Sequence, residues 1–341
     1  MQEATMSTRA SAPPPEQAPP PDQGPARLPS FERGTGWLGS GPLSPATLQG
    51  RVVLVDFWTF TCVNWLRTFP YLRAWEEKYR DAGLTVVGVH TPEFDFEHDP
   101  GNVAAECRRL GVEYPVLLDA RYGVWEEFAN HYWPAVYVAD ATGRIRYHRF
   151  GEGEYAATEM VIQRLLTDAG GEIGADLVEV APQGLEVAAD WRTLRSPETY
   201  LGFDRSTGFV SEGVASFGRT GRFEIPDRLP LNAWGLDGDW TVSAEWVRLD
   251  GRAGRLAMRF GARDVNLVMR AGGDGPIPFR VLLDGRAPGE DAGTDLGPDG
   301  RGELARPGTY QLIRRADTRG DGLFEIEFSA PSAYGYCVTF G

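Results

Sequence analysis

The residue with the most direct chemical potential in this 341-residue sequence is Cys62. It follows the apolar run 52–58, which Asp56 alone interrupts, and it precedes a segment whose apolar residues recur at helical spacing. A thiol at the start of a helix faces unpaired backbone N–H groups and the positive end of the helix dipole, and both favour the nucleophilic thiolate. We therefore expect a reactive Cys62 with a pKa below the free-thiol value of about 8.5. The alternative is a buried structural thiol.

The motif Asp56-Phe57-Trp58, followed by three residues and Cys62, resembles the thioredoxin superfamily, specifically its TlpA-like and DipZ-like thiol–disulfide oxidoreductases. The resemblance implies that Cys62 is the nucleophile and that Asp56 exchanges protons with the active-site thiols. The alternative for Asp56 is a structural carboxylate that neighbouring strand ends hold by hydrogen bonds. These enzymes usually complete the site as Cys-x-x-Cys, whereas here Trp65 stands at the second position. Because the second cysteine normally releases the mixed disulfide, this chain needs another thiol for that step.

Four further residues complete the expected site. In the family a cis-proline stands beside the nucleophile, which assigns that place to Pro134 and implies that Trp133 offers backbone hydrogen bonds to an extended substrate. Trp65, one helical turn after Cys62, could cover the thiol or stack on a substrate, or simply pack against its own helix. Cys107, on a predicted helix, is a candidate resolving cysteine or a bystander.

Three functions remain open on these residues. The first is a thioredoxin-like oxidoreductase that acts through Cys62 alone on a protein disulfide or a low-molecular-weight thiol and is resolved by an external thiol. The second is a peroxide reductase, because Thr59-Phe60-Thr61-Cys62 resembles the Thr-x-x-Cys of peroxiredoxins, although Val55 replaces their proline. The third is a non-catalytic binding or scaffold protein. Motifs for a metal, a flavin or a nucleotide are missing from the sequence, so we expect no cofactor.

The elements that must position these residues alternate between strand and helix from residue 36 to 170, as an α/β thioredoxin-like domain requires. The pattern predicts helices from residue 63 and over 102–110, 122–130 and 155–166, and strands over 52–58, 84–89, 114–118, 135–138 and 145–150.

From residue 196 to 341 the pattern changes to short strands between turn residues, which predicts an all-β, jelly-roll-like sandwich. Segments such as Gly238-Asp239-Trp240 and Phe340-Gly341 resemble the carbohydrate-binding-module-like domain that follows thioredoxin domains in DipZ-like proteins. The resemblance makes a glycan a candidate partner. Its aromatic residues could form a sugar-stacking platform, although core packing is favoured: Trp191, Trp234, Trp240, Trp246, Tyr310, Tyr334 and Tyr336. The strands are expected over 241–249, 255–260, 265–269, 279–283, 309–313, 323–328 and 336–340.

The remaining segments carry no recognisable chemistry. Residues 1–35 are proline-rich and are expected to form a disordered arm, and residues 171–195 are expected to link the two domains. The net charge of −14 disfavours nucleic acid and anionic membrane surfaces as partners. The sequence contains no stretch apolar enough to span a bilayer. Its N-terminus lacks a signal peptide, which predicts a cytoplasmic protein although related proteins are often exported.

Overall fold

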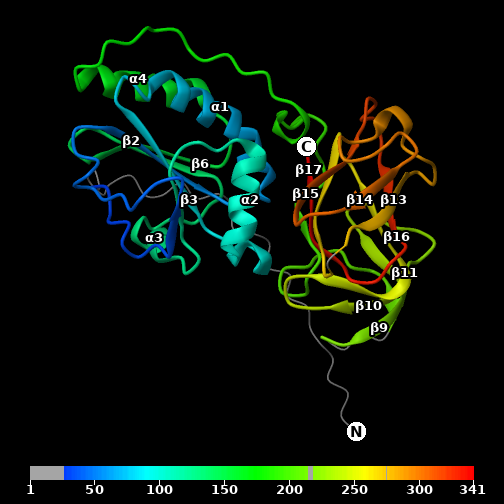
Figure 1. The fold of residues 1–341 in the computed structure, drawn as a ribbon. Helices are drawn as coiled ribbons and strands as arrows, with labels where there is room; N and C mark the ends of the chain where they lie inside the picture. The colour runs from blue at the N-terminus through cyan, green and yellow to red at the C-terminus, as the bar shows by residue number, and fades with distance from the viewer. Residues whose placement is uncertain (1–26, 214–217, 274) are drawn as a thin grey trace, which may run out of the picture.

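The computed structural model describes residues 27–213, 218–273 and 275–341 and shows an α/β part beside an all-β part (Figure 1). The sequence-based prediction of the fold class is confirmed. The α/β part contains β1 (Gly36–Leu38), β2 (Val52–Trp58), α1 (Val63–Tyr79), β3 (Leu84–His90), α2 (Pro100–Leu110), β4 (Val116–Leu118), α3 (Gly123–Glu127), β5 (Ala135–Ala139), β6 (Ile145–Phe150) and α4 (Tyr155–Asp168).

The first sheet has the strand order β1-β4-β3-β2-β5-β6, with β2, β3 and β4 mutually parallel. All seven residues of β2 are buried because helices or chain segments cover both faces of this central strand. Its residues alternate between a cluster that includes α1, α2 and α4 and a second cluster that includes α3. Asp56 lies on the same face of β2 as Val52 and Leu54, because alternate residues of a strand share a face, so its side chain faces α1.

The expected N-terminal arm is too long by several residues. Residues 1–26 lie outside the described part of the chain, whereas Leu28 and Phe31 are buried in the cluster beside α3. Leu28 N donates to the carbonyl of Gly143, and the ring of Phe31 stacks at 6.5 Å on that of Phe128. Two apolar side chains inside a proline-rich stretch are enough to attach it to the domain, because burying each one is favourable by about 1.5–3 kcal/mol.

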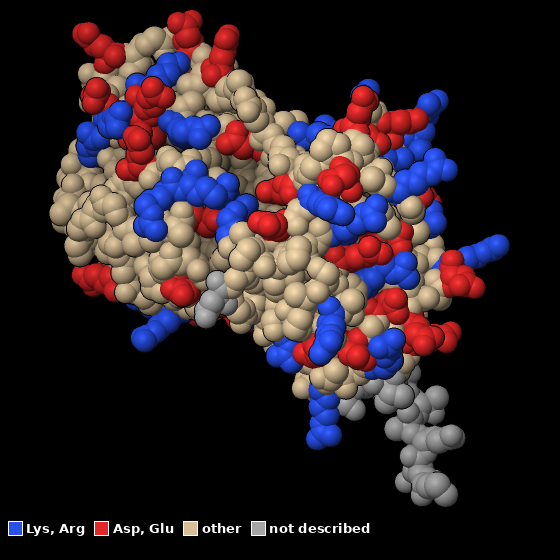
Figure 2. Space-filling model, turned by 45° about the vertical axis from the view of Figure 1, so that its right-hand side comes forward, with Lys and Arg blue, Asp and Glu red and all other residues tan. Residues whose placement is uncertain are grey.

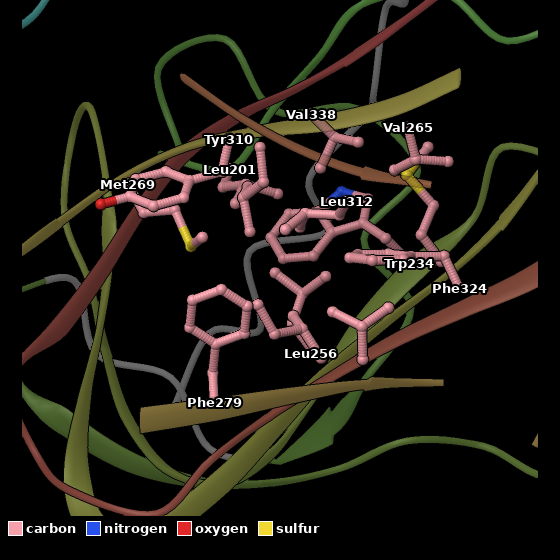
Figure 3. Packing of buried hydrophobic residues seen from close by; sticks show 14 of the residues in the cluster. Leu201, Trp234, Leu256, Val265, Met269, Phe279, Tyr310, Leu312, Phe324 and Val338 are labelled. Carbon is pink, nitrogen blue, oxygen red and sulfur yellow. The ribbon is translucent and has the colours of Figure 1, made fainter. Parts of the chain in front are cut away.

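The all-β part is a sandwich of two layers that β11 connects. One layer has the order β14-β13-β16-β11-β10-β9-β8, and the other pairs β15 with β12, β12 with β17 and β17 with β7. Apolar side chains from both layers fill the space between them, as Figure 3 shows. The strands are β7 (Thr199–Tyr200), β8 (Glu212–Gly213), β9 (Thr220–Glu224), β10 (Trp234–Val242), β11 (Val247–Phe260), β12 (Asp264–Ala271), β13 (Ile277–Leu283), β14 (Arg301–Leu304), β15 (Gly308–Arg314), β16 (Gly322–Phe328) and β17 (Ala333–Phe340).

One expectation for this part is wrong. The segment 241–249 is not one strand, because β10 ends at Val242 and β11 begins at Val247, so a short turn lies inside the apolar pattern. For the aromatic residues, core packing is the favoured role, and it is confirmed at three of the seven positions. Trp234, Trp240 and Tyr310 are buried in the core between the layers, where their rings have no access to a ligand.

The two parts pack against each other through the outer face of the layer that contains β12 and β17. Strand alternation turns Asn266, Val268 and Thr339 away from the sandwich core, yet all three are buried because the α/β part covers them. The C-terminus lies at this junction (Figure 1). Residues 171–195 contain no strand, and the one-turn 3-10 helix Gly184–Glu186 within them packs on α1.

None of the helices in the described ranges is long and apolar enough to cross a bilayer. Acidic and basic side chains are interspersed over the face shown in Figure 2, so neither sign dominates it. A surface of this kind presents no continuous basic field for a polyanion.

Candidate functional site

Cys62 lies in the short connection between β2 and α1 and is the N-cap residue of that helix. Its backbone is extended (φ −68°, ψ 110°), its N–H donates to the carbonyl of Thr59, and its own carbonyl accepts from Leu66 N at 3.0 Å. The thiol makes no capping hydrogen bond to the helix. Of the three cysteines, Cys62 is half-buried whereas Cys107 and Cys337 are buried, and all three are free.

The surroundings of Cys62 raise the pKa of its thiol well above the usual value, which corrects the expectation of a depressed pKa. Burial contributes most, and the negative charges of Glu198 and Glu93 add to it. The backbone N–H groups of Trp65 and Asn64 act in the expected direction and lower the pKa, but they do not prevail. Among the described residues, the two charged groups with the largest effect on this pKa are carboxylates, in contrast to the thiol–cation pairing typical of highly reactive cysteines.

Trp65 points into the protein and not toward a substrate. Its side chain is 0% exposed, its indole Nε1 donates to Asp56 Oδ2 at 2.8 Å, and its ring stacks on that of Trp58 with centroids 4.2 Å apart. The expectation that Trp65 binds substrate is therefore wrong. A first-turn position of an amphipathic helix can face either the surface or the sheet, and the apolar stripe of α1 turns this one toward the sheet.

Asp56 is fully buried, and burial raises its pKa from 3.8 to about 7, although the hydrogen bond from Trp65 lowers it. Its second oxygen, Oδ1, has no partner among the described residues. A carboxyl group in these surroundings is close to half protonated at neutral pH. The carboxyl group of Asp56 accepts its hydrogen bond from the indole of Trp65, the residue at the position where the thioredoxin-like Cys-x-x-Cys motif has its second cysteine.

The Trp133–Pro134 peptide bond is cis. Pro134 comes directly before β5, whose first residue Ala135 pairs with Phe57, so Pro134 lies at the end of β2 that leads to Cys62. The ring of Trp133 is half-buried and packs 4.4 Å from that of Trp125. This placement agrees with the substrate-binding position that the family resemblance implies, and the binding role itself stays a prediction.

Glu97 is a site residue that the sequence analysis missed. It is 1% exposed, and its carboxylate accepts from Thr61 Oγ1 at 2.6 Å and from the backbone N–H groups of Glu93 and Phe94 at 2.7 and 2.9 Å. Burial raises its pKa to about 7, and the hydrogen bond from Thr61 opposes that rise. Glu97 therefore ties the loop after β3 to the residue before Cys62. A glutamate in a polar loop carries no sequence signal for this role.

His90 is at the end of β3 and pairs in register with Trp58. It is buried, its ring stacks on Phe60, and burial lowers its pKa to about 3. Its imidazole is consequently neutral at physiological pH. A neutral imidazole cannot lower the pKa of Cys62 by charge, which agrees with a structural role for His90.

The β part covers one side of the cysteine. Thr309 Oγ1 on β15 donates to the carbonyl of Thr61 at 2.7 Å. Farther along the interface, Tyr200 and Arg205 both donate to Glu93 Oε1 at 2.8 Å, so the loop after β3 is held by the same domain. Elements of both parts of the chain thus contact the residues around the half-buried Cys62.

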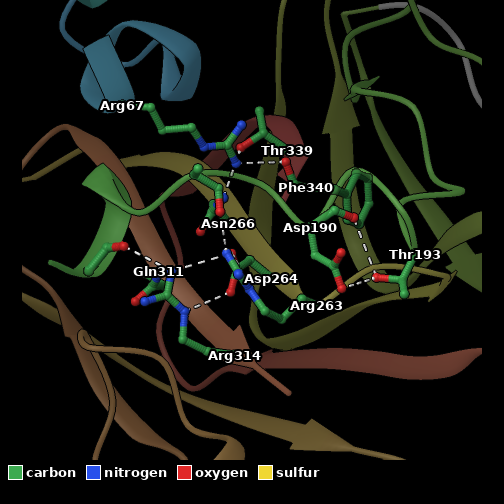
Figure 4. Close-up of polar contacts among 12 residues, drawn as sticks. Arg67, Asp190, Thr193, Arg263, Asp264, Asn266, Gln311, Arg314, Thr339 and Phe340 are labelled. Atoms are coloured by element: carbon green, nitrogen blue, oxygen red, sulfur yellow. Dashed lines mark hydrogen bonds and ion pairs between the residues drawn. The ribbon is translucent and has the colours of Figure 1, made fainter. Parts of the chain in front are cut away.

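Arg67 provides a second contact between the parts, one helical turn along α1. Its guanidinium donates to the carbonyl of Phe340 at 3.0 Å and to Glu152 at 2.8 Å, as Figure 4 shows for Phe340. The arginine side chain is only 3% exposed. A buried charge that bonds to a strand end of the other part keeps the two parts in register.

Cys107 lies on α2 in the same large apolar cluster that Cys62 borders. Burial raises its pKa to about 12, and the charges that act on it are Glu106 and Arg108 of its own helix. They differ from the two carboxylates that act on Cys62. The structure thus gives the proposed resolving role of Cys107 no support.

A hollow in the described chain lies on the other layer of the sandwich, away from the cysteine. It encloses about 850 Å³, and its lining includes the charged residues Arg255, Arg280, Arg301 and Glu327. These four lie in one register row across β11, β16, β13 and β14. A row of charged side chains differs from the aromatic platforms on which sugars stack. The binding of a glycan by this part therefore stays a prediction.

Comparisons with known proteins match two separate parts of the chain. Residues 26–148 match the model of the AhpC/TSA family, and residues 196–341 match that of the thioredoxin like C-terminal domain. Protein DipZ of Mycobacterium tuberculosis and of Mycobacterium bovis is 38% identical over 264 residues, which are 76% of this chain and 36% of DipZ. The chain thus spans about a third of the length of these relatives.

Two further similarities concern the first part of the chain. The thiol-disulfide oxidoreductase YkuV of Bacillus subtilis is 26% identical over 41% of this chain and 95% of its own length. The solution structure of a thioredoxin-like protein in the oxidised form is 28% identical, with a TM-score of 0.38, over 42% of this chain and 95% of that protein.

Proposed function

Since the chain joins a thioredoxin-like domain of the AhpC/TSA family to a thioredoxin-like C-terminal domain, we propose that it is a thiol–disulfide oxidoreductase whose nucleophile is Cys62. The observation that carries the proposal is the position of this thiol. Cys62 caps α1 beside the N–H groups of Asn64 and Trp65, and it is the least buried of the three cysteines.

In the proposed reaction the Cys62 thiolate attacks one sulfur of a substrate disulfide. The Cys62–substrate disulfide forms, the original disulfide breaks, and the second substrate sulfur leaves as a thiolate. The N–H groups at the start of α1 stabilise the attacking sulfur, and the backbone next to Pro134 is available to an extended substrate. A protein disulfide or the disulfide of a low-molecular-weight thiol fits this chemistry, and a second thiol must then release the adduct.

Asp56 has a different role in this proposal from its counterparts in Cys-x-x-Cys enzymes. Its Oδ2 is taken by the indole of Trp65, which stands where the second thiol would exchange a proton. We assign Asp56 as a positioning residue that holds Trp65 and, through it, the first turn of α1. Pro134 and Trp133 are assigned to substrate binding.

The test is the covalent state of the protein after exposure to glutathione disulfide, followed by intact-mass spectrometry at several pH values. We expect a glutathione adduct to form in the natural protein and in Cys107→Ser, and not in Cys62→Ser. Adduct formation should accelerate with pH, because the thiolate is the nucleophile. A Cys62 that forms no adduct at any pH at which the protein stays folded contradicts the proposal and favours a binding or scaffold role.

Peroxide reduction is the alternative enzyme activity, and the AhpC/TSA match and Thr59-Phe60-Thr61-Cys62 are the observations in its favour. It is disfavoured because the charged groups with the largest effect on the pKa of Cys62, within the described residues, are carboxylates and not cations. Peroxide consumption that depends on Cys62 and exceeds the rate of a free thiol would make this the better assignment.

A further inference from the structure

A thioredoxin-like site in which Trp65 points inward needs its resolving thiol from elsewhere in the fold. We propose that this thiol is Cys337 on β17, so that the two domains together carry one redox pair, Cys62 and Cys337. The inference rests on the proposed function, because Cys337 has a substrate to release only if Cys62 forms a mixed disulfide. The structure gives the other remaining cysteine, Cys107, no support in this role.

The position of Cys337 follows from the register of the layer that packs on the α/β part. Val268 of β12 pairs with Thr309 of β15 on one side and with Cys337 of β17 on the other, and Cys337 pairs with Tyr200 of β7. Directly opposed residues in antiparallel strands project their side chains to the same face. Val268 and Cys337 belong to the apolar cluster of the α/β part, and Tyr200 packs against it, so this face is the interface.

Both ends of this four-residue row are bonded to the immediate surroundings of Cys62. Thr309 binds the carbonyl of Thr61, the residue before Cys62, at 2.7 Å. At the other end, the Tyr200 hydroxyl binds Glu93, a carboxylate whose charge acts on Cys62. Neighbouring strands are about 4.8 Å apart, so the backbone of Cys337 lies about 10 Å from that of Thr309, between the two anchors.

The charged groups around the Cys62 and Cys337 thiols also support the pairing. Glu198 and Glu93 are the two charged groups with the greatest effect on both Cys62 and Cys337, and they raise the pKa of both thiols in addition to burial. The charge of Glu198 acts directly on the Cys337 thiol, and Glu198 Oε2 lies 2.9 Å from the Tyr200 hydroxyl. Two thiols that share both carboxylates lie in one local environment.

This arrangement gives the resolving step its proton acceptor. The Cys337 thiol transfers its proton to the Glu198 carboxylate, and the resulting thiolate attacks the Cys62 sulfur of the mixed disulfide. A Cys62–Cys337 bond forms, the bond from Cys62 to the substrate breaks, and the reduced substrate leaves as a thiolate. Two molecules of an external low-molecular-weight thiol return the internal disulfide to two thiols: the first forms a mixed disulfide with one cysteine, and the second releases that cysteine and leaves as the disulfide of the external thiol. A disulfide needs Cα atoms within about 7 Å, so oxidation draws β17 and the start of α1 together.

The pairing is tested by oxidising the full chain with the thiol oxidant diamide and mapping its peptides without reduction. Trypsin places the three cysteines in separate peptides, 52–67, 81–108 and 320–341. We expect a linked pair of peptides 52–67 and 320–341 and the loss of both free thiols. Cys107→Ser should give the same link as the natural protein, whereas Cys337→Ser and Cys337→Val should lose it.

The kinetics of the glutathione adduct test the resolving role itself. We expect the adduct at Cys62 to disappear at least tenfold faster in the natural protein than in Cys337→Ser or Cys337→Val, with Cys107→Ser unchanged. Circular dichroism and the unfolding midpoint identify the variant that keeps the fold, and that variant is used. A link from 52–67 to 81–108, or no internal link, overturns the inference. Equal adduct lifetimes in a folded Cys337 variant and in the natural protein also overturn the inference, but the proposed function then still stands. If none of the proteins forms the adduct, both the inference and the proposed function are overturned.

Discussion

The indole Nε1 of Trp65 donates to Asp56 Oδ2 at 2.8 Å, and both side chains are fully buried. The tryptophan therefore partners the carboxylate from the position where a Cys-x-x-Cys site has its second thiol. It also fills the space under α1 by stacking on Trp58. The pair explains how a carboxylate inside an apolar strand is accommodated without the second thiol.

Trp65→Phe should destabilise the protein by about 1–3 kcal/mol, because it removes the one donor to Asp56 while keeping most of the apolar volume. Trp65→Cys, which restores a Cys-x-x-Cys sequence, should cost more, about 3–5 kcal/mol, since it also leaves a cavity. Urea denaturation at pH 7 measures both. Trp191→Phe is the matched control, because Trp191 is 62% exposed and should have no effect. Equal stability of Trp65→Phe and the natural protein would show that the hydrogen bond contributes nothing.

The free energy of unfolding should fall as the pH rises from about 4 to about 7. Burial raises the pKa of Asp56 from 3.8 to about 7, so over this range the folded state keeps a proton that the unfolded state has lost. Glu97 contributes in the same direction for the same reason. Asp56→Asn stays neutral and should show a shallower dependence, whereas Asp168→Asn, at an exposed position, should follow the natural curve. Parallel curves for Asp56→Asn and the natural protein would contradict the assignment.

Alkylation of Cys62 by iodoacetamide should show an inflection above the free-thiol value of about 8.5, because burial and two carboxylates raise the pKa of this thiol. Glu198→Gln removes one of the two charges and should move the inflection to lower pH. Glu212→Gln serves as the control, since it changes an exposed glutamate on β8. The readout is the alkylated fraction of peptide 52–67. An inflection below 8.5 in the natural protein would show that the helix terminus lowers the pKa of Cys62 by more than burial and the carboxylates raise it.

Arg67→Leu should reduce the stability by about 3–5 kcal/mol, because it leaves Glu152 buried without its cation and the carbonyl of Phe340 without its donor. Arg164→Leu breaks the Arg164–Asp168 ion pair, in which the arginine side chain is 76% exposed, and should cost less than about 1 kcal/mol. The difference between the two unfolding midpoints in urea is the measurement. If the two substitutions have equal effects, Arg67 does not hold the domains together.

A single proteolytic cut within residues 171–195 should leave two fragments that stay associated. The outer face of the β sandwich buries Val268, Asn266 and Thr339 against the α/β part, and separation would expose them. Size-exclusion chromatography of the nicked protein should give one peak at the mass of the whole chain. Two peaks of stable fragments would show that the interface is weaker than its burial indicates.

Local patterns along the chain predict most of the elements. Apolar periodicity indicates β2, α1 and β3 closely, because a central strand is buried on both faces and a covering helix on one. The turn between β10 and β11 is missed, since apolar residues continue on both sides of it. The buried residues Leu28 and Phe31 are missed because their proline-rich neighbours dominate the composition.

The sequence alone determines that Cys62 caps a helix, that Asp56 lies inside a strand and that the second thiol of the motif is missing, because each depends on spacing along one segment. Tertiary structure alone decides which way Trp65 points, which charges act on Cys62 and that Cys337 lies in the same environment. These depend on the packing of β17, more than 270 residues away, over the start of α1. A dipole effect can be expected from a helix terminus, but burial and two carboxylates reverse it, and one of these carboxylates, Glu198, comes from beyond the α/β part.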